Sequence, residues 1–154
     1  MRISEFLCKD AVSNDLKAAS KADVITEMVG LLAEAGAIEK RSRNKVIETL
    51  MAREALGSTA IGQGIAIPHG KSDATDTLVA ALGISKRGVN FDSLDGEPAH
   101  IFFLLIAPVD SSGPHLKALA RVSRLLKDKF FRQALREAKT PQEAIKLIKD
   151  ENEY

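Results

Sequence analysis

The stretch Ala99-His100-Ile101-Phe102-Phe103-Leu104-Leu105-Ile106-Ala107 decides the fold, because its apolar residues run without the alternation of a half-buried strand. A continuous apolar run of this kind is typical of a central strand that is covered on both faces in a layered α/β sheet. Two further apolar runs, Ile65–Ile67 and Leu78–Ile84, are too short for helices and lie in a glycine-rich region. The middle of the chain therefore predicts a sheet.

Helical patterns lie on both sides of this region. Before it, apolar residues repeat at helical spacing over Ser20–Gly36 and Ser42–Ala55. After it, a polar loop of residues 110–114 leads into three further helical patterns, which are Leu116–Leu126, Phe130–Ala138 and the segment from Thr140, with Pro141 at its first helical position. The order of helices, strands and helices predicts a layered α/β fold. Residues 6–16 leave open a short helical turn with an edge strand or irregular structure.

Length and composition restrict the class of protein. The chain has 154 residues, of which 45% are hydrophobic and 28% charged, which predicts one globular domain over residues 1–154. The formal charge is only +1 and tryptophan is absent, so neither a nucleic acid nor an acidic membrane is an expected partner. The apolar runs fall well short of the roughly 20 residues that cross a bilayer, so we expect a cytoplasmic protein without membrane insertion. Cys8 is the only cysteine, which excludes an internal disulfide.

The segment Arg53–Lys71 carries the candidate site. It joins a helix end to the hydroxyl pair Ser58 and Thr59, and it ends in Pro68-His69-Gly70-Lys71. Proline fixes its own backbone and lacks an N–H, while Gly70 lets the chain turn or approach a ligand closely. We therefore expect the His69 imidazole at the end of a strand, exposed and oriented.

Three small-molecule interpretations of this segment are weak. Gly62-Gln63-Gly64 begins like a dinucleotide fingerprint but precedes a strand instead of following one. The loop from Gly64 to Ser72 resembles a phosphate-binding loop, yet five residues separate its glycines where the motif has four. A metal site would need His69, His100 and His115 to converge, and no pair of these histidines has the spacing of a zinc-binding helix. We expect His100 to pack or to make a hydrogen bond.

A fourth interpretation is phosphoryl transfer on histidine. A neutral imidazole has a free lone pair, and the phosphoryl group that it would accept needs guanidinium, hydroxyl, amide or imidazole donors nearby. Arg53, Ser58, Thr59 and His115 are available, and His115 follows Gly113-Pro114 at the start of a helix. Each has a structural alternative, because Arg53 could cap its own helix, the hydroxyls could belong to a turn, and loop histidines are more often solvated than catalytic.

A family resemblance favours the phosphoryl interpretation. Arg53-Glu54, Gly57-Ser58-Thr59 and the string from Gly62 to Gly70 together resemble the phosphorylation site of fructose/mannitol-type enzyme IIA domains of the bacterial phosphotransferase system. The resemblance extends through Phe91–Pro98 and His115-Leu116-Lys117, so it covers nearly the whole chain. It implies a mixed β-sheet sandwiched between helices in a single three-layer domain. One departure is Ala60, where many members have glycine.

The resemblance also implies roles for individual residues. His69 would accept a phosphoryl group on Nε2 from phosphorylated HPr or from an HPr-like phosphocarrier of the nitrogen branch. His115 and Arg53 would lie beside that group, with hydrogen-bonding support from Ser58, Thr59 and Gly70. No metal or organic cofactor is required.

Two biological roles share this chemistry. Sugar-specific members pass the phosphoryl group to a cysteine on a IIB domain, which works with membrane-embedded IIC domains. This chain contains neither domain, and it resembles the nitrogen-regulatory branch, whose phosphorylation state controls potassium-transport and regulatory proteins. A IIA component of a fructose-type permease and a non-catalytic binding module are the alternatives.

Overall fold

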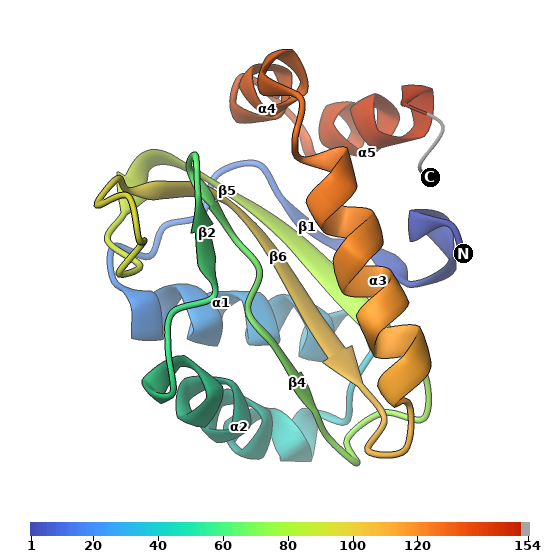
Figure 1. Cartoon of the computed structure of the whole chain (residues 1–154). Helices are drawn as coiled ribbons and strands as arrows, with labels where there is room; N and C mark the ends of the chain where they lie inside the picture. The colour runs from blue at the N-terminus through green and yellow to red at the C-terminus, as the bar shows by residue number, and fades with distance from the viewer. Residues whose placement is uncertain (152–154) are drawn as a thin grey trace.

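A computed structural model, which describes residues 1–151, places a six-stranded sheet between helices (Figure 1). The elements of this part of the chain are, in order, η1 (Ile3–Glu5), β1 (Leu7–Ser13), α1 (Lys21–Glu34), η2 (Lys40–Ser42), α2 (Arg43–Ala55), β2 (Ala60–Gly62), β3 (Ile65–Ala66), β4 (His69–Lys71), β5 (Val79–Val89), β6 (Ala99–Ala107), α3 (Ser112–Leu125), α4 (Lys129–Arg136) and α5 (Pro141–Asp150). None of the helices within residues 1–151 is long and apolar enough to cross a bilayer.

The sheet is mixed, as predicted. Its strand order is β1-β5-β6-β3-β2, and β4 pairs with β6 beside β3. β6 is antiparallel to β5 and parallel to both β3 and β4. Because Ile65 pairs with Ile101 and His69 with Leu105, β3 and β4 lie end to end along one edge of β6. Pro68 separates them, and its carbonyl accepts a hydrogen bond of 2.9 Å from the N–H of Leu105.

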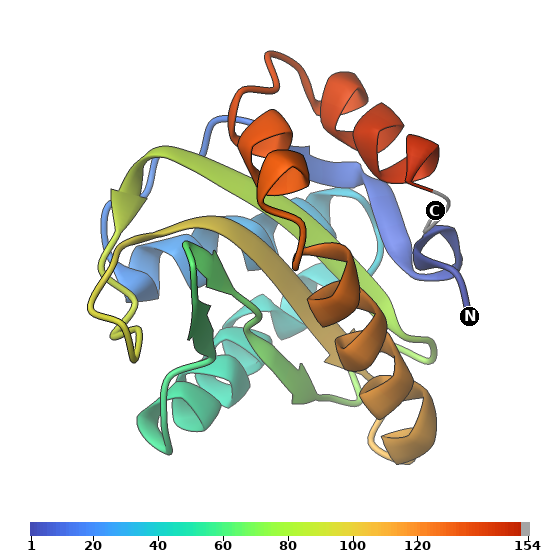
Figure 2. The ribbon, with the colours of Figure 1, turned by 45° about the horizontal axis from the view of Figure 1, so that its top comes forward.

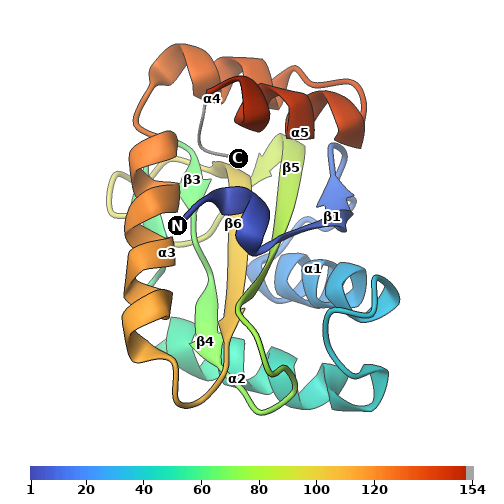
Figure 3. The same cartoon turned by 90° about the vertical axis from the view of Figure 1, so that its right-hand side faces the viewer.

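β6 divides the interior into two cores, which confirms the expectation that it is covered on both faces. Successive side chains of a strand point to opposite faces of the sheet. One face carries Ile101, Phe103 and Leu105 into a core with α3, α4 and α5, and the other carries Phe102, Leu104 and Ile106 into a core with α1 and α2. All six of these side chains are buried. Figure 3 shows the sheet edge-on between α3 and the α1–α2 layer, which is the predicted three-layer arrangement.

The C-terminal helices close one end of this sandwich. α4 packs on β5 and β6, and α5 packs on β1, so that both lie across the end of the sheet that β4 does not reach (Figure 2). Thr140 caps α5 by accepting a hydrogen bond of 3.1 Å from the N–H of Glu143, and Pro141 occupies the first helical position, as the sequence predicted.

α2 runs antiparallel to β4 along its outer side. Lys45 at the start of α2 pairs with Asp73 beyond β4 at 3.1 Å, and one turn later a Cβ placed on Gly70 would meet Thr49 at 3.2 Å. One further turn brings Arg53 to the beginning of β4, because residues four apart share a helix face. The four-residue spacing along α2 thus places Arg53 at the end of β4 where His69 lies.

Of the two alternatives left open for residues 6–16, the short helical turn with an edge strand is correct, because η1 leads into β1, which forms one edge of the sheet beside β5. Two local predictions need correction. The short strands β2 and β4 were not predicted. The polar loop ends earlier than the sequence indicated, because α3 begins at Ser112 and takes Gly113 and Pro114 into its first turn. Proline is tolerated there since the first amides of a helix have no partner within the helix.

Candidate functional site

His69 opens β4, and its imidazole is held in one orientation. The Nδ1 atom lies 2.7 Å from the carbonyl oxygen of Ile67, and the side chain is half-buried. A carbonyl only accepts hydrogen bonds, so Nδ1 carries the proton and the lone pair of the neutral ring lies on Nε2. Within residues 1–151 no hydrogen bond occupies Nε2. The outward nitrogen of His69 is therefore a free nucleophile.

His115 reaches the same place from the first turns of α3. The two imidazole rings meet edge to face, with centroids 5.4 Å apart and planes inclined at 71°. Burial lowers the pKa of His115 below its usual 6.5, and the charges of His69 and Lys71 lower it further. His115 is thus neutral near pH 7, and its buried Nε2 has no hydrogen-bond partner among the described residues. A second imidazole with an unused polar atom adjoins the first.

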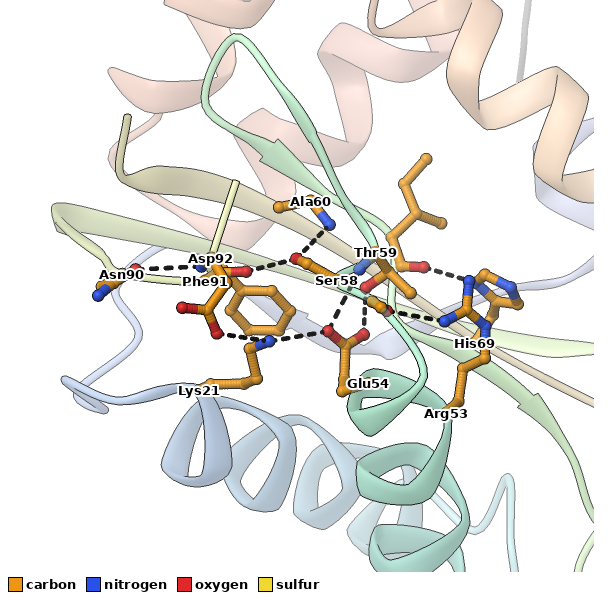
Figure 4. Close-up of polar contacts among 12 residues, drawn as sticks. Lys21, Arg53, Glu54, Ser58, Thr59, Ala60, His69, Asn90, Phe91 and Asp92 are labelled. Atoms are coloured by element: carbon orange, nitrogen blue, oxygen red, sulfur yellow. Dashed lines mark hydrogen bonds and ion pairs between the residues drawn. The ribbon is translucent and has the colours of Figure 1, made fainter. Parts of the chain in front are cut away.

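Arg53 stands at the end of α2. Its Nη1 donates a hydrogen bond of 2.8 Å to the carbonyl of Gly57, so it caps the turn that follows its own helix. Figure 4 draws the guanidinium extending from α2 to the level of the His69 ring. This is the only hydrogen bond that the guanidinium makes within residues 1–151, and a guanidinium has five N–H donors. Arg53 therefore does cap the end of its helix, which was the structural alternative, and its other N–H groups are left for a ligand.

Lys71 fastens the two elements that carry the histidines. Its ammonium donates to the hydroxyl of Ser112, which joins the end of β4 to the first residue of α3. The sequence analysis assigned Lys71 no role. Nothing in the local sequence pairs it with a residue 41 positions away, since that contact depends on the register of β4 along β6.

The Ser58 and Thr59 hydroxyls are engaged within the protein. Ser58 donates to the carbonyl of Phe91 and accepts a 3.0 Å hydrogen bond from the N–H of Ala60. Thr59 is buried and its hydroxyl donates to the carboxylate of Glu54. The bonds to Ala60 and Glu54 are those of turn residues, which was the structural alternative, while the bond to Phe91 is a tertiary contact. Their support of a phosphoryl group stays a prediction, as does that of Gly70.

His100 does not join the other two histidines. Its Nδ1 lies 2.9 Å from the carbonyl oxygen of Ser85, and its Nε2 lies 3.4 Å from a nitrogen of Arg136. The ring also packs on Gly88, where an added Cβ would come within 2.8 Å. The predicted packing role is confirmed. In residues 1–151 no three His, Cys, Asp or Glu side chains gather in a way that could hold a metal ion.

Glu54, the buried carboxylate next to Arg53, was not predicted from the sequence. A signal was present, because Glu54 continues the i, i+4, i+8 stripe of Val46 and Leu50, both of which are buried. A charged residue on an apolar stripe indicates a buried charge with specific partners.

Comparisons with known proteins place this geometry in context. Residues 5–151 match the family described as phosphoenolpyruvate-dependent sugar phosphotransferase system, EIIA 2. The chain is 37% identical over 148 residues to a nitrogen regulatory protein of Bradyrhizobium diazoefficiens, a match that covers 96% of this chain and 95% of that protein. It is 40% identical to the fructose-specific EIIABC component of Bacillus subtilis over 96% of this chain, which spans only 23% of that protein.

A solved structure shares the whole fold. The nitrogen regulatory protein IIA-Ntr of Neisseria meningitidis superposes with a TM-score of 0.84 at 32% identity, covering 95% of this chain and 98% of that one.

Proposed function

Because the chain belongs to the EIIA type 2 family of the phosphoenolpyruvate-dependent phosphotransferase system, we propose that it is a phosphocarrier that accepts a phosphoryl group on His69. The donor is a phosphorylated HPr or HPr-like carrier. The observation that carries the proposal is the hydrogen bond of 2.7 Å between His69 Nδ1 and Ile67, which leaves the lone pair on Nε2, beside the ring of His115.

The transfer is an in-line exchange between two imidazoles. The Nε2 lone pair of His69 forms a bond to phosphorus, and the bond between phosphorus and the donor imidazole breaks, with its electron pair returning to the donor nitrogen. The proton stays on Nδ1 and remains hydrogen-bonded to the carbonyl oxygen of Ile67, which stabilises the positive charge that the ring gains when Nε2 is substituted. The protein has no further bond to make or break, so its contribution is positioning and stabilisation of charge.

His115 and Arg53 supply that stabilisation. The phosphoryl group brings nearly two negative charges and three acceptor oxygens. The N–H groups of Arg53 that make no hydrogen bond are donors of the required kind, and the unused Nε2 of His115 is one when it carries the ring proton. Arg53 comes from α2 and His115 from α3. The two residues approach His69 from opposite layers of the fold.

We favour a nitrogen-regulatory role. The nitrogen regulatory proteins of Bradyrhizobium diazoefficiens and Neisseria meningitidis match this chain over nearly their whole length, the first in sequence and the second in structure. In this role the phosphorylation state of His69 governs binding to regulated partners, among which potassium-transport and regulatory proteins are the expected class. The 40% identity to the Bacillus subtilis fructose component supports a second role, in which the phosphoryl group passes to a IIB cysteine.

The test is the intact mass of the protein incubated with phosphoenolpyruvate, enzyme I and an HPr-like carrier, followed by peptide mapping at neutral or alkaline pH. We expect one phosphate on the peptide that contains His69. His69→Ala should abolish the gain in mass, and His100→Asn is the matched control that should retain it. Phosphate on His69→Ala at the wild-type rate would disprove the assignment.

The same sample separates the two roles. After removal of the donor proteins, a fructose-type IIB domain is added and the phosphate on His69 is followed with time. Rapid loss to the IIB cysteine identifies the sugar-uptake role, while retention favours the regulatory role. If no carrier phosphorylates the wild-type protein, the chain is a binding module and the phosphocarrier proposal fails.

A further inference from the structure

Glu54 is a buried carboxylate in the last turn of α2. Its residue is only 6% exposed, and both oxygens have partners. One oxygen accepts the backbone N–H of Thr59 at 3.2 Å, and the other accepts the Thr59 hydroxyl. The ammonium of Lys21, at the start of α1, lies 3.2 Å from the first oxygen (Figure 4).

Burying the Glu54 carboxylate costs free energy, and hydrogen bonds from Thr59 and an ion pair with Lys21 offset that cost. An isolated buried carboxylate is strongly unfavourable, whereas one with an ion pair and several hydrogen bonds is tolerated. The Lys21 side chain is itself 16% exposed, pairs with Asp92 at 3.0 Å and lies 4.9 Å from the ring centre of Phe91. Such a charge contributes little net stability compared with an apolar residue of similar size, so we look for its role in positioning.

The bonds that start at Glu54 lead to the nucleophile. Glu54 fixes Thr59 through two hydrogen bonds, and the carbonyl of Thr59 accepts the N–H of Ile67 at 3.0 Å. The carbonyl of the same Ile67 holds Nδ1 of His69. The path from the Glu54 carboxylate to the Ile67 carbonyl oxygen, which fixes the tautomer of His69, therefore runs through the backbone of Thr59 and Ile67 alone.

The same carboxylate also steadies the cation of the site. Arg53 donates to the carbonyl of Gly57, which lies in the turn between Glu54 and Thr59. By closing that turn through Thr59, Glu54 fixes the position of the carbonyl to which the guanidinium is bound. One buried group thus restrains both the imidazole and the guanidinium.

We propose that Glu54 is a positioning residue of the phosphoryl-acceptor site, which holds His69 in the tautomer with Nδ1 protonated and holds Arg53 beside it. It acts through Thr59, Ile67 and Gly57 and does not touch the phosphoryl group. This inference rests on the proposed function for its effect on transfer, but its effect on the His69 ring exists in the protein without any donor.

Glu54→Gln is the sharpest substitution because it keeps the shape of the side chain. The oxygen of the neutral amide can accept a hydrogen bond from only one of the two Thr59 donors, and it cannot form an ion pair with Lys21. The amide NH₂ group replaces the other carboxylate oxygen, so it faces a donor and not an acceptor. The turn should loosen, and the hydrogen bond from His69 Nδ1 to Ile67 should weaken. We expect the ring to shift toward a mixture of tautomers and phosphoryl transfer to slow by about tenfold or more, the scale of effects of groups that orient a reacting group.

The primary measurement is the two-bond ¹H–¹⁵N correlation spectrum of the histidine rings in the free, full-length protein, at a pH where His69 is neutral. The wild type should show Nδ1 protonated and Nε2 unprotonated at His69, and Glu54→Gln should show partial averaging of the two nitrogen shifts. Glu48→Gln is the matched control, since Glu48 is an exposed residue of the same helix and the change in charge is identical. An unaltered His69 pattern in a folded Glu54→Gln protein would overturn the proposal.

Thr59→Val keeps the test decisive if Glu54→Gln does not fold. It removes only the hydroxyl that donates to Glu54 and leaves Lys21 paired. We expect a smaller shift of the His69 tautomer in the same direction, and no shift would again contradict the proposal. The spectrum is recorded without phosphate, so direct contact between the Thr59 hydroxyl and a phosphoryl group cannot produce the effect. If the wild type never accepts phosphate, the proposed function fails while the spectra still decide the role of Glu54.

Discussion

Consecutive residues of α2 play opposite parts at this site. Within residues 1–151 most N–H donors of the Arg53 guanidinium make no hydrogen bond, whereas both carboxylate oxygens of Glu54 accept hydrogen bonds inside the protein. A helix turns by about 100° per residue, so neighbours in sequence face different surroundings. In the proposed function, Arg53 would contact the phosphoryl oxygens and Glu54 would fix the backbone around them.

The sequence was informative about residues with a distinctive local setting. His69 stands out between a proline and a glycine, and its partner His115 stands out at a helix start. The Ser58 and Thr59 hydroxyls were harder to interpret, because whether a hydroxyl faces a ligand or a buried carboxylate depends on tertiary contacts. The bond from Ser58 to Phe91 spans 33 residues, which no local pattern encodes.

At the residue scale, Arg53→Ala should slow phosphoryl transfer to His69. The variant loses one charge-stabilising donor, an effect of about 10²–10³ in rate if Arg53 acts like a single such group. The measurement is the rate of phosphate gain by rapid mixing with phosphorylated carrier. Arg41→Ala is the control, since Arg41 is exposed and its ion pair within residues 1–151 is with the nearby Glu39. Equal rates in both variants would remove Arg53 from the site.

At the scale of elements, the close fit between α2 and β4 sets the distance from Arg53 to His69. Gly70 permits that fit, because any side chain there would meet Thr49 and Leu50 of α2 at 3.2 and 3.6 Å. Its backbone is not in the left-handed region, so the requirement is one of space alone. The glycine predicted as a phosphate support thus has a packing role that the structure does show.

Gly70→Ala should destabilise the protein by about 1–3 kcal/mol, the usual cost of overpacking a fitted contact. The helix would be displaced from the strand by a few tenths of an ångström, and transfer should slow with it. Unfolding in urea measures the first effect. Gly30→Ala is the matched control, because a methyl group there meets only ordinary contacts and replaces glycine inside α1, which should raise stability by about 0.5–1 kcal/mol. A Gly70→Ala variant as stable as the wild type would show that α2 adjusts freely.

Capping and periodicity predicted the helices well, and strand length explains what was missed. α1 begins after Ser20 and α5 after Thr140, each with the expected side-chain cap. β2 and β4, which were not predicted, have only three residues each, too few to show a period of two. β4 forms because β6 offers an edge to pair with, and β2 forms because it pairs with β3, and both edges exist only in the folded molecule.

At the scale of the whole molecule, stability should depend on pH through His115. Its pKa is lowered in the folded protein, first by burial and then by the charges of His69 and Lys71. Between the ordinary value of 6.5 and the lowered value, the unfolded chain binds a proton that the native protein resists. The free energy of unfolding should therefore fall as the pH drops below about 6.5, and this contribution is lost once the pH is below the folded pKa.

Unfolding in urea at about pH 7.5 and about pH 5.5 checks this prediction. His115→Gln should lose less stability than the wild type over that interval, because the variant has nothing to titrate there. Asp15 and Asp95 have pKa values lowered below 3.8, so their contributions are lost only at more acidic pH and do not interfere. Phosphorylation of His69 should reverse the shift, since the added negative charge favours the imidazolium form of His115. An identical pH dependence in both proteins would exclude His115 as its source.

The two cores that β6 separates have a consequence for what the site can report. His69 belongs to the sheet, Arg53 to the layer of α1 and α2, and His115 to the layer of α3. If the proposed function holds, no single layer contains all three residues of the phosphoryl-acceptor site. A chain in which one layer has separated from β6 should then accept no phosphate, even though the other layer is intact. A partner that responds to phosphorylation would in that case bind only fully folded molecules.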